Sequence, residues 1–124
     1  MKSGQPYSIP YHRVLKENEK AILAKILERE TPKLVEQIGS LKVIARCGCG
    51  KCPTVLFSQT DSIEPLPHSQ YKEVASYVGK DASCGLVGVI VWESEEQIAE
   101  LEFYSIDGHD PYEAPNAKDI EPYG

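Results

Sequence analysis

Hydrophobic and polar residues follow a helical period in the first third of the chain. From Glu17 to Arg29 apolar residues recur every three to four positions opposite a charged face, which predicts an amphipathic helix. Asn18 is the expected N-cap of this helix. Thr31-Pro32 is typical of a second start, because threonine caps helices well and proline is favoured at the first helical position. The pattern therefore predicts two helices, or one bent helix, over residues 17–39.

Beyond residue 39 the apolar residues alternate with a period of two, which is typical of β-strands. Strands are predicted over residues 41–47, 53–58, 71–78, 84–92 and 97–105. The segment 84–92 is the most apolar of them and is expected at the centre of the sheet. Helices followed by strands that short turns connect are typical of the α+β class. We therefore expect N-terminal helices packed on an antiparallel sheet of four or five strands.

Neither end of the chain has a strong period. Residues 1–13 contain two prolines and are expected to form an extended arm, although alternating apolar residues also allow a short edge strand. Residues 107–124 contain three prolines and few apolar residues, which favours irregular structure or disorder. A chain of 124 residues is short for two cores. We expect one domain, with an α+β core over residues 14–106 between this arm and an acidic, proline-rich tail.

Composition narrows the class of protein. Hydrophobic residues make up 41% of the chain and charged residues 26%, which is ordinary for a soluble globular protein. No apolar run is long enough for a transmembrane helix, and no apolar segment of a signal peptide follows the N-terminal charge. The sequence therefore predicts a cytoplasmic protein without membrane contact, in which the cysteines are reduced thiols.

The net charge of −6 is unevenly distributed along the chain. Residues 1–52 carry a net charge of +5, residues 53–92 of −2 and residues 93–124 of −9. An acidic segment of this kind repels nucleic acid and attracts basic proteins. The basic residues of the predicted helix alternate with glutamates, which is typical of a solvated face. We therefore expect a basic protein partner and no nucleic acid.

Three of the four cysteines lie close together in residues 47–52. Thiolates are good zinc ligands, and glycines let the backbone fold around an ion, so one hypothesis is a structural zinc site formed by Cys47, Cys49, Cys52 and Cys84. The first spacing, C-x-C, is tighter than in common zinc sites, and the chain has no second C-x-x-C pair. The interpretation that we favour is a tight hairpin of small, half-buried cysteines without a cofactor. A third hypothesis is a reactive thiol at Cys49 or Cys84.

The run of residues 47–55 resembles the cysteine- and glycine-rich hairpin of a group of small, uncharacterised bacterial proteins. Residues 18–23 are similar to the glutamate-rich N-terminal helix of that group, and residues 101–105 followed by Gly108 are similar to its last strand. The resemblance extends over residues 15–108 and leaves out the acidic tail. It implies a fold rather than an activity, because no activity is established for the group. A looser similarity connects the compact, acidic chain with toxin immunity proteins.

No enzyme is expected, since the chain lacks G-x-S-x-G, H-E-x-x-H and phosphate-loop motifs. An acidic inhibitor can fill the positive cleft of a nuclease and associate rapidly through electrostatic steering, and tyrosine is a good interface anchor. We therefore hypothesise an immunity or antitoxin-type protein that neutralises a basic bacterial toxin domain, a nuclease in the first instance. The expected partner-binding residues are Glu100, Glu102, Asp107, Asp110, Tyr112, Glu113, Asp119 and Glu121.

Overall fold

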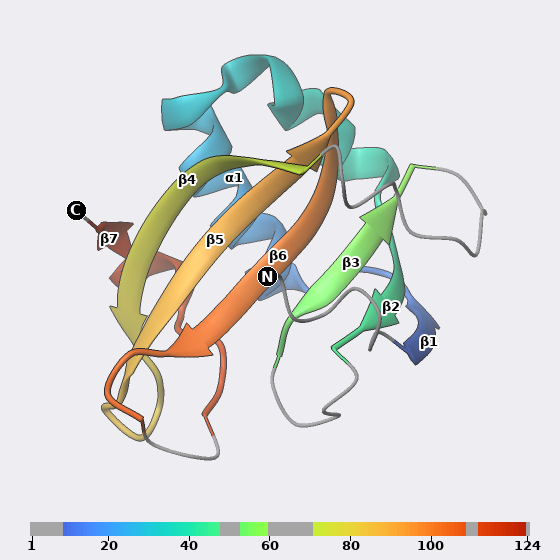
Figure 1. Ribbon diagram of the computed structural model, residues 1–124. Helices are drawn as coiled ribbons and strands as arrows, with labels where there is room; N and C mark the ends of the chain where they lie inside the picture. Colours follow the sequence, from blue (N-terminus) through green and yellow to red (C-terminus); the bar gives the residue numbers. More distant parts are fainter. Residues whose placement is uncertain (1–8, 48–52, 60–70, 109–111, 124) are drawn as a thin grey trace.

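The computed structural model describes residues 9–47, 53–59, 71–108 and 112–123 (Figure 1). In chain order the elements are β1 (Ile9–Arg13), α1 (Glu17–Glu30), the 3₁₀ helix η1 (Pro32–Ser40), β2 (Lys42–Arg46), β3 (Val55–Ser58), β4 (Tyr71–Lys80), β5 (Leu86–Ser94), β6 (Gln97–Ser105), the 3₁₀ helix η3 (Ala117–Asp119) and β7 (Glu121–Pro122). Among the helices of these residues, none has the length and apolar character needed to cross a bilayer.

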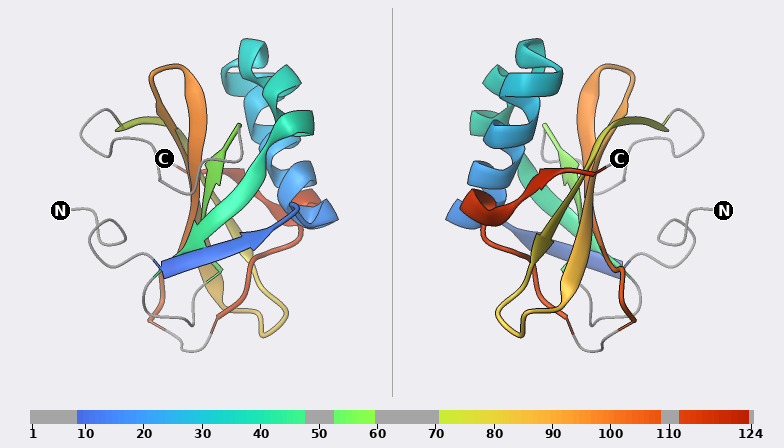
Figure 2. Two further views of the ribbon diagram at one scale, coloured as in Figure 1. Left: turned by 90° about the vertical axis from the view of Figure 1, so that its right-hand side faces the viewer. Right: turned by 90° about the vertical axis from the view of Figure 1, so that its left-hand side faces the viewer.

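The strands form one antiparallel sheet in the order β1-β2-β3-β6-β5-β4-β7. Two groups of strands, β1-β2-β3 and β6-β5-β4, meet where β3 pairs with β6. The helices α1 and η1 lie on one face of this sheet (Figure 2). The predicted α+β class is therefore confirmed.

The predicted number of four or five strands is wrong, because seven strands are present in the described residues. The two additional strands are the edges of the sheet. β1 has five residues, of which four are exposed, and β7 has two exposed residues. The short edge strand that the alternating residues of 1–13 allowed is present as β1, whereas the two exposed residues of β7 have no hydrophobic alternation that could predict a strand.

The core lies between α1 and the sheet. The helical residues Ile22, Leu23, Ile26 and Leu27 have no exposed surface and form one apolar stripe. The stripe packs against inward-facing side chains of the central strands, among them Val87, Val89, Val91, Leu101 and Phe103. Burying one such aliphatic side chain contributes about 1.5–3 kcal/mol, so this contact dominates the stability of the two layers.

The helix α1 begins two residues earlier than the N-cap prediction implies. Its N-cap is Lys16 rather than Asn18, which lies inside the first turn. The backbone N–H of Lys16 donates to Oε1 of Glu19 at 2.8 Å, as expected for a glutamate three residues after an N-cap. The predicted second helix starts at Pro32 but is a 3₁₀ helix, and the side chain of Thr31 does not cap it.

Strands β2 to β6 agree closely with the predicted segments, but the predicted central position of residues 84–92 is wrong. The most apolar strand, β5, is internal but lies beside the central position, which β6 occupies. The β5–β6 hairpin turns at Glu95 and Glu96, which both adopt positive φ angles of 52° and 65°. Positive φ at both central residues is the geometry of the two-residue turns that match the twist of a hairpin.

Residues 112–123, here called the strap, pass the β4–β5 turn and the first turn of α1 and end beside β4 (Figure 2). Tyr112–Asn116 is irregular, as predicted, but the strap is held in place by specific contacts. Ala117 and Ile120 are buried in the core, and β7 pairs with β4. The amide of Asn18 donates to Pro115 O at 2.9 Å and accepts from Ala117 N at 3.0 Å.

Candidate functional site

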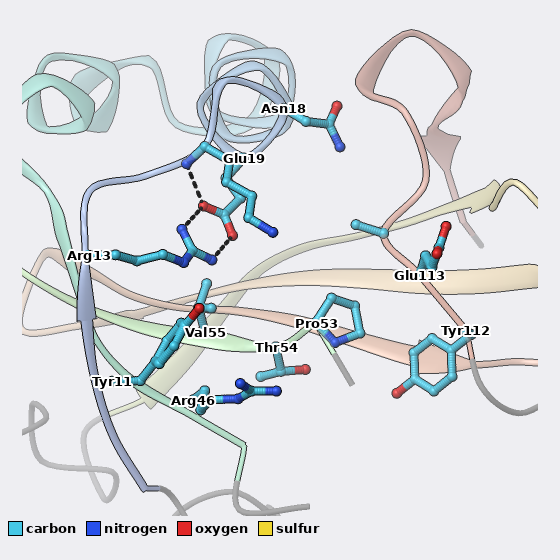
Figure 3. Close-up of a pocket in the computed structure, with 12 residues that line it drawn as sticks. Tyr11, Arg13, Asn18, Glu19, Arg46, Pro53, Thr54, Val55, Tyr112 and Glu113 are labelled. Atoms are coloured by element: carbon cyan, nitrogen blue, oxygen red, sulfur yellow. Dashed lines mark hydrogen bonds and ion pairs between the residues drawn. The ribbon is translucent and has the colours of Figure 1, made fainter. Parts of the chain in front are cut away.

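A groove of about 460 Å³ opens between the edge of the sheet at β1 and β2, the first turn of α1 and the strap (Figure 3). Its floor is the start of β3, where Pro53, Thr54 and Val55 lie. One wall carries the basic side chains of Arg13, Lys16 and Arg46. The opposite wall is formed by strap residues 112–114.

The basic wall is organised by a buried ion pair between Arg13 and Glu19 (Figure 3). Arg13 Nη1 donates to Glu19 Oε1 at 2.8 Å and Nη2 donates to Oε2 at 2.7 Å. Glu19 retains only 5% of its surface, and the hydrogen bonds that Arg13 donates to its carboxylate raise the pKa of Arg13 above its usual value. Two parallel hydrogen bonds fix both the position and the plane of a guanidinium. The Nε of Arg13 is buried and has no acceptor among the described residues.

The ring of Tyr11 lies between two guanidinium groups on this wall. The guanidinium carbon of Arg46 is 4.9 Å from the ring centre and that of Arg13 is 5.5 Å from it. Both distances are within the range of cation–π attraction, which favours arginine stacked on a tyrosine face. A stacked guanidinium keeps its N–H groups at its edge, where they can still meet an anion.

The far wall is fixed by hydrogen bonds to the backbone of Phe103. Tyr112 donates from its hydroxyl to Phe103 O at 3.0 Å. Thr54 Oγ1 accepts from Phe103 N at 2.9 Å and lies 3.2 Å from Phe103 O as a donor. These side-chain bonds continue the β3–β6 contact beyond the two residue pairs of its ladder. The ring of Tyr112 is therefore held in one orientation at the edge of the groove.

The groove combines basic side chains with the aromatic rings of Tyr11 and Tyr112, and Thr54 and Val55 of its floor are buried. Within the described part of the chain, no group of three or more histidine, cysteine or acidic residues is placed to hold a metal ion. Concave sites with a few polar and aromatic groups are typical of ligand binding rather than of covalent chemistry.

The predicted partner-binding residues fall into two separate groups. Four exposed carboxylates lie near the β4–β5 turn and are here called the acidic rim: Asp107, Glu113, Asp119 and Glu121. Two shallow hollows of about 440 and 410 Å³ adjoin this turn, and both include Lys80, Asp81 and Asp119. Glu121 lines one hollow and Glu113 the other, while Asp107 accepts from the N–H of the neighbouring Leu86 at 3.1 Å.

The strap is attached to this turn by a buried carboxylate. Asp81 Oδ1 accepts from the N–H groups of Ser83 and Gly85, each at 3.0 Å, and its Oδ2 accepts from Glu113 N at 3.1 Å. Lys25 holds the other end of the strap, since its Nζ donates to Ala117 O at 3.0 Å and to Ile120 O at 2.8 Å. Lys25 therefore helps to fix the strap, whereas the sequence predicted only a solvated face for the basic residues of this helix. Three of the four rim carboxylates, those of Glu113, Asp119 and Glu121, are therefore carried by a positioned segment.

Glu100 and Glu102 lie away from the rim, and the prediction for Glu100 is wrong. Glu100 has no exposed surface, so it cannot contact a partner. The pKa of the nearby Tyr71 is raised, first by burial of Tyr71 and second by the negative charge of Glu100. Glu102 is half-buried and accepts from Trp92 Nε1 at 2.8 Å. Burial follows strand position and tertiary packing, which charge distribution along the chain does not report.

The remaining predicted residues have different outcomes. Tyr112 is half-buried in the groove wall, next to the rim residue Glu113, and Asp110 lies outside the described residues. Cys47 is half-buried and Cys84 is exposed, whereas Cys49 and Cys52 lie outside the described residues.

The sheet order does not favour Cys84 as a fourth zinc ligand. The strands β2 and β5, next to Cys47 and Cys84, are separated by β3 and β6. Three steps between neighbouring strands amount to a distance on the order of 14 Å, whereas zinc–sulfur bonds are about 2.3 Å long. Zinc bound by the three cysteines of residues 47–52 stays a prediction.

Sequence reasoning missed the groove, since its walls come from β1, α1, β2, β3 and the strap. The one local feature that pointed to this region is Glu19, three residues after Lys16. A glutamate at this spacing indicates the start of a helix, but it does not predict the bond between Glu19 and Arg13. Comparison of the chain with protein-family models, characterised proteins and solved structures gave no match.

Proposed function

We propose that this chain is a cytoplasmic immunity or antitoxin-type protein that binds a basic bacterial toxin domain through the acidic rim and has no catalytic role. The observation that carries the proposal is the attachment of the strap. Hydrogen bonds with Asn18, Lys25 and Asp81 hold it to α1 and to the β4–β5 turn. The exposed carboxylates of the rim therefore stand on a scaffold rather than on a free tail.

A positioned set of carboxylates suits recognition of a basic cleft. Ordering a segment before binding lowers the entropic cost of the complex, so a held strap binds more tightly than a loose one. A cluster of negative carboxylates on one side of a small protein also accelerates encounter with a cationic partner by about 10- to 1,000-fold at low salt. Nuclease toxins carry such cationic surfaces because they bind phosphates. Lys80 lines both hollows beside the rim, and we expect it to lie at the margin of the contact.

The test compares two variants that remove the same charge. The rim variant carries Asp107→Asn, Glu113→Gln, Asp119→Asn and Glu121→Gln. The control variant carries Glu17→Gln, Glu28→Gln, Glu36→Gln and Glu73→Gln, which are exposed residues of α1, η1 and β4. A basic protein captured from a lysate of the native host is purified and expressed alone, and growth of the expressing cells is measured with each form of the chain.

We expect the wild-type chain and the control variant to restore growth, and the rim variant to fail. In stopped-flow measurements the rim variant should associate at least about tenfold more slowly at low salt and show a weaker dependence on salt. Association that is insensitive both to salt and to the rim substitutions would refute the proposal. A captured partner that is acidic, or that does not inhibit growth, would refute it as well.

A further inference from the structure

The acidic rim borders a half-exposed apolar patch on the face of the sheet opposite to α1. In β4, β5 and β6 the core residues alternate with residues that point away from the helices, which cover the other face (Figure 2). Among the latter, Val78 pairs with Gly88 and Gly88 pairs with Tyr104, so the three form one row across the sheet. The apolar residues of this row and beside it are half-buried or exposed and are here called the outer patch: Val78, Leu86, Ile90 and Tyr104.

Two features make the outer patch suitable as a contact surface. The ring of Tyr104 lies over Gly88, where a Cβ would overlap it, so the ring is packed against the backbone of β5. Leu86 is 37% exposed, and the exposed Tyr123 adjoins this region, because its backbone N–H donates to Ser76 O of β4 at 3.0 Å. The other large apolar residues of comparable exposure among those described lie at the β1 edge: Ile9, Tyr11 and Val14. The outer patch is therefore the exposed apolar surface that adjoins the acidic rim.

One of the hollows beside the β4–β5 turn joins the outer patch to the rim. Its volume is about 440 Å³, and its lining includes Val78 and Leu86 of the patch together with Asp119 and Glu121 of the rim. Glu121 pairs with Val78, so both side chains start on the same face of the sheet. Lys80 also lines the hollow, but it is exposed and its flexible side chain can turn into solvent. This hollow thus offers an apolar wall and two carboxylates.

We infer that this hollow takes an arginine side chain of the basic partner and that the outer patch forms the centre of their contact, an inference that rests on the proposed function. The aliphatic stem of the arginine packs on Val78 and Leu86, and its guanidinium donates to the carboxylates of Asp119 and Glu121. Protein interfaces have an apolar centre inside a polar rim, and tyrosine and arginine are enriched among the residues that contribute most affinity. Rim charges alone act more on the association rate. A second copy of this chain fits less well, because it would bring carboxylates against carboxylates.

The first test is an amide-shift titration of the full chain by nuclear magnetic resonance with three small probes. Butylguanidinium carries the stem and the head of the proposed side chain, guanidinium lacks the stem, and butyrate joins a similar stem to the opposite charge. We expect butylguanidinium to shift the amides of Gly79, Leu86 and Glu121 with a Kd on the order of 10 mM, as usual for so small a ligand. Guanidinium should bind at least about threefold more weakly, and butyrate should give no localised shift.

Variants place the binding in the hollow. Leu86→Ser should raise the Kd of butylguanidinium by at least about threefold, because it removes part of the apolar wall. Asp119→Asn combined with Glu121→Gln should abolish the localised shifts. Val14→Ser, at the β1 edge and 74% exposed, should leave the Kd unchanged.

The second test uses the basic protein purified for the growth assay. Leu86→Ser and Tyr104→Ser should each raise its dissociation rate by about tenfold or more and change its association rate by less than about twofold, whereas the rim variant slows association. Val14→Ser is again the control. Leu86 is exposed, so the first variant guards against a folding defect in the second.

Three results would overturn the inference. The first is the absence of localised shifts at about 100 mM butylguanidinium, well above the expected Kd. The second is equal binding of butylguanidinium and guanidinium. The third is an unchanged dissociation rate in both Leu86→Ser and Tyr104→Ser, and if the rim variant still associates slowly, the inference fails while the proposed function stands. Binding of butylguanidinium in the hollow without any basic toxin partner would refute the proposed function and still support the arginine site.

Discussion

Replacing Glu19 by glutamine tests the ion pair that organises both α1 and the groove. Removing one partner of a buried pair costs about 3–5 kcal/mol, because the other charge stays desolvated. The side chain of Arg13 retains 21% exposure, so water recovers part of this loss. Glutamine also keeps one oxygen that can accept from Lys16 N. We therefore expect the free energy of unfolding to fall by about 2–3 kcal/mol.

The assay is urea denaturation followed by circular dichroism, with a matched control in the same helical turn. Glu17 pairs with Lys20 at 3.7 Å but is 93% exposed, so Glu17→Gln should leave the midpoint unchanged. A double-mutant cycle with Arg13→Gln isolates the pair, and we expect a coupling energy above about 1.5 kcal/mol. Raised salt should reduce this coupling only slightly, since buried pairs are poorly screened.

The pH dependence of this effect has a definite sign. The folded-state pKa of Arg13 is raised, first of all by its hydrogen bonds to Glu19. Its contribution is therefore complete below the unfolded-state pKa of arginine and is lost only as pH rises through the folded-state value. The destabilisation by Glu19→Gln should be the same at about pH 7 and about pH 9. A coupling energy near zero, or equal effects of Glu17→Gln and Glu19→Gln, would refute the reasoning.

Three further predictions concern other parts of the fold. Gly79→Ala should lower the free energy of unfolding, measured in urea, by about 1–3 kcal/mol, because the added Cβ would lie 2.9 Å from Ile120 Cγ2. An unchanged urea midpoint would show instead that the strap moves to accommodate the methyl group. A strong chelator should leave the Tm unchanged, whereas a drop of several degrees would indicate zinc in the loop after Cys47. Stability should fall as pH rises above about 10, because burial raises the pKa of Tyr71 and Tyr77 above the unfolded value. Tyr71→Phe should flatten that decline, and an identical slope would contradict the assignment.

The interior of the fold was predictable from the sequence because burial imposes a period. The stripe of Ile22, Leu23, Ile26 and Leu27 is fully buried, and α1 ends at Glu30, where the sequence predicted its end. The predicted strand over residues 97–105 matches β6 in both bounds. In these elements the spacing of residues along the helix or strand decides which side chains enter the core. The local hydrophobic pattern is therefore sufficient to predict which residues are buried.

The edges were less predictable because tertiary contacts maintain them. β1 is mostly exposed, and β7 consists of two residues that pair with Tyr77 and Val78. The strap has few apolar residues, yet two of them are buried and its backbone is held by side chains of α1. Such bonds join residues nearly a hundred positions apart, and local pattern carries no record of them.

The candidate sites show the same division. Charge distribution located the segment that carries the acidic rim, but it did not separate the exposed Glu121 from the buried Glu100. The groove depends on Tyr11, Arg13 and Arg46, which come from two strands and meet only because β1 pairs with β2. Its signal could have been found only by pairing these strands in the correct register.

Because the strap is attached by bonds that can open, affinity for a partner depends on the fraction of molecules in which the strap is closed. Asn18 bonds to backbone groups of the strap 97 and 99 positions later, next to the contacts of Lys25 and the buried Ala117. A segment held in this way opens locally, at a free energy below that of global unfolding, and its amides should exchange with solvent first. If the rim binds only when the strap is closed, the apparent Kd rises in proportion to the time spent open. Asn18, an uncharged residue of the first helix, would then tune recognition of a basic partner through that equilibrium.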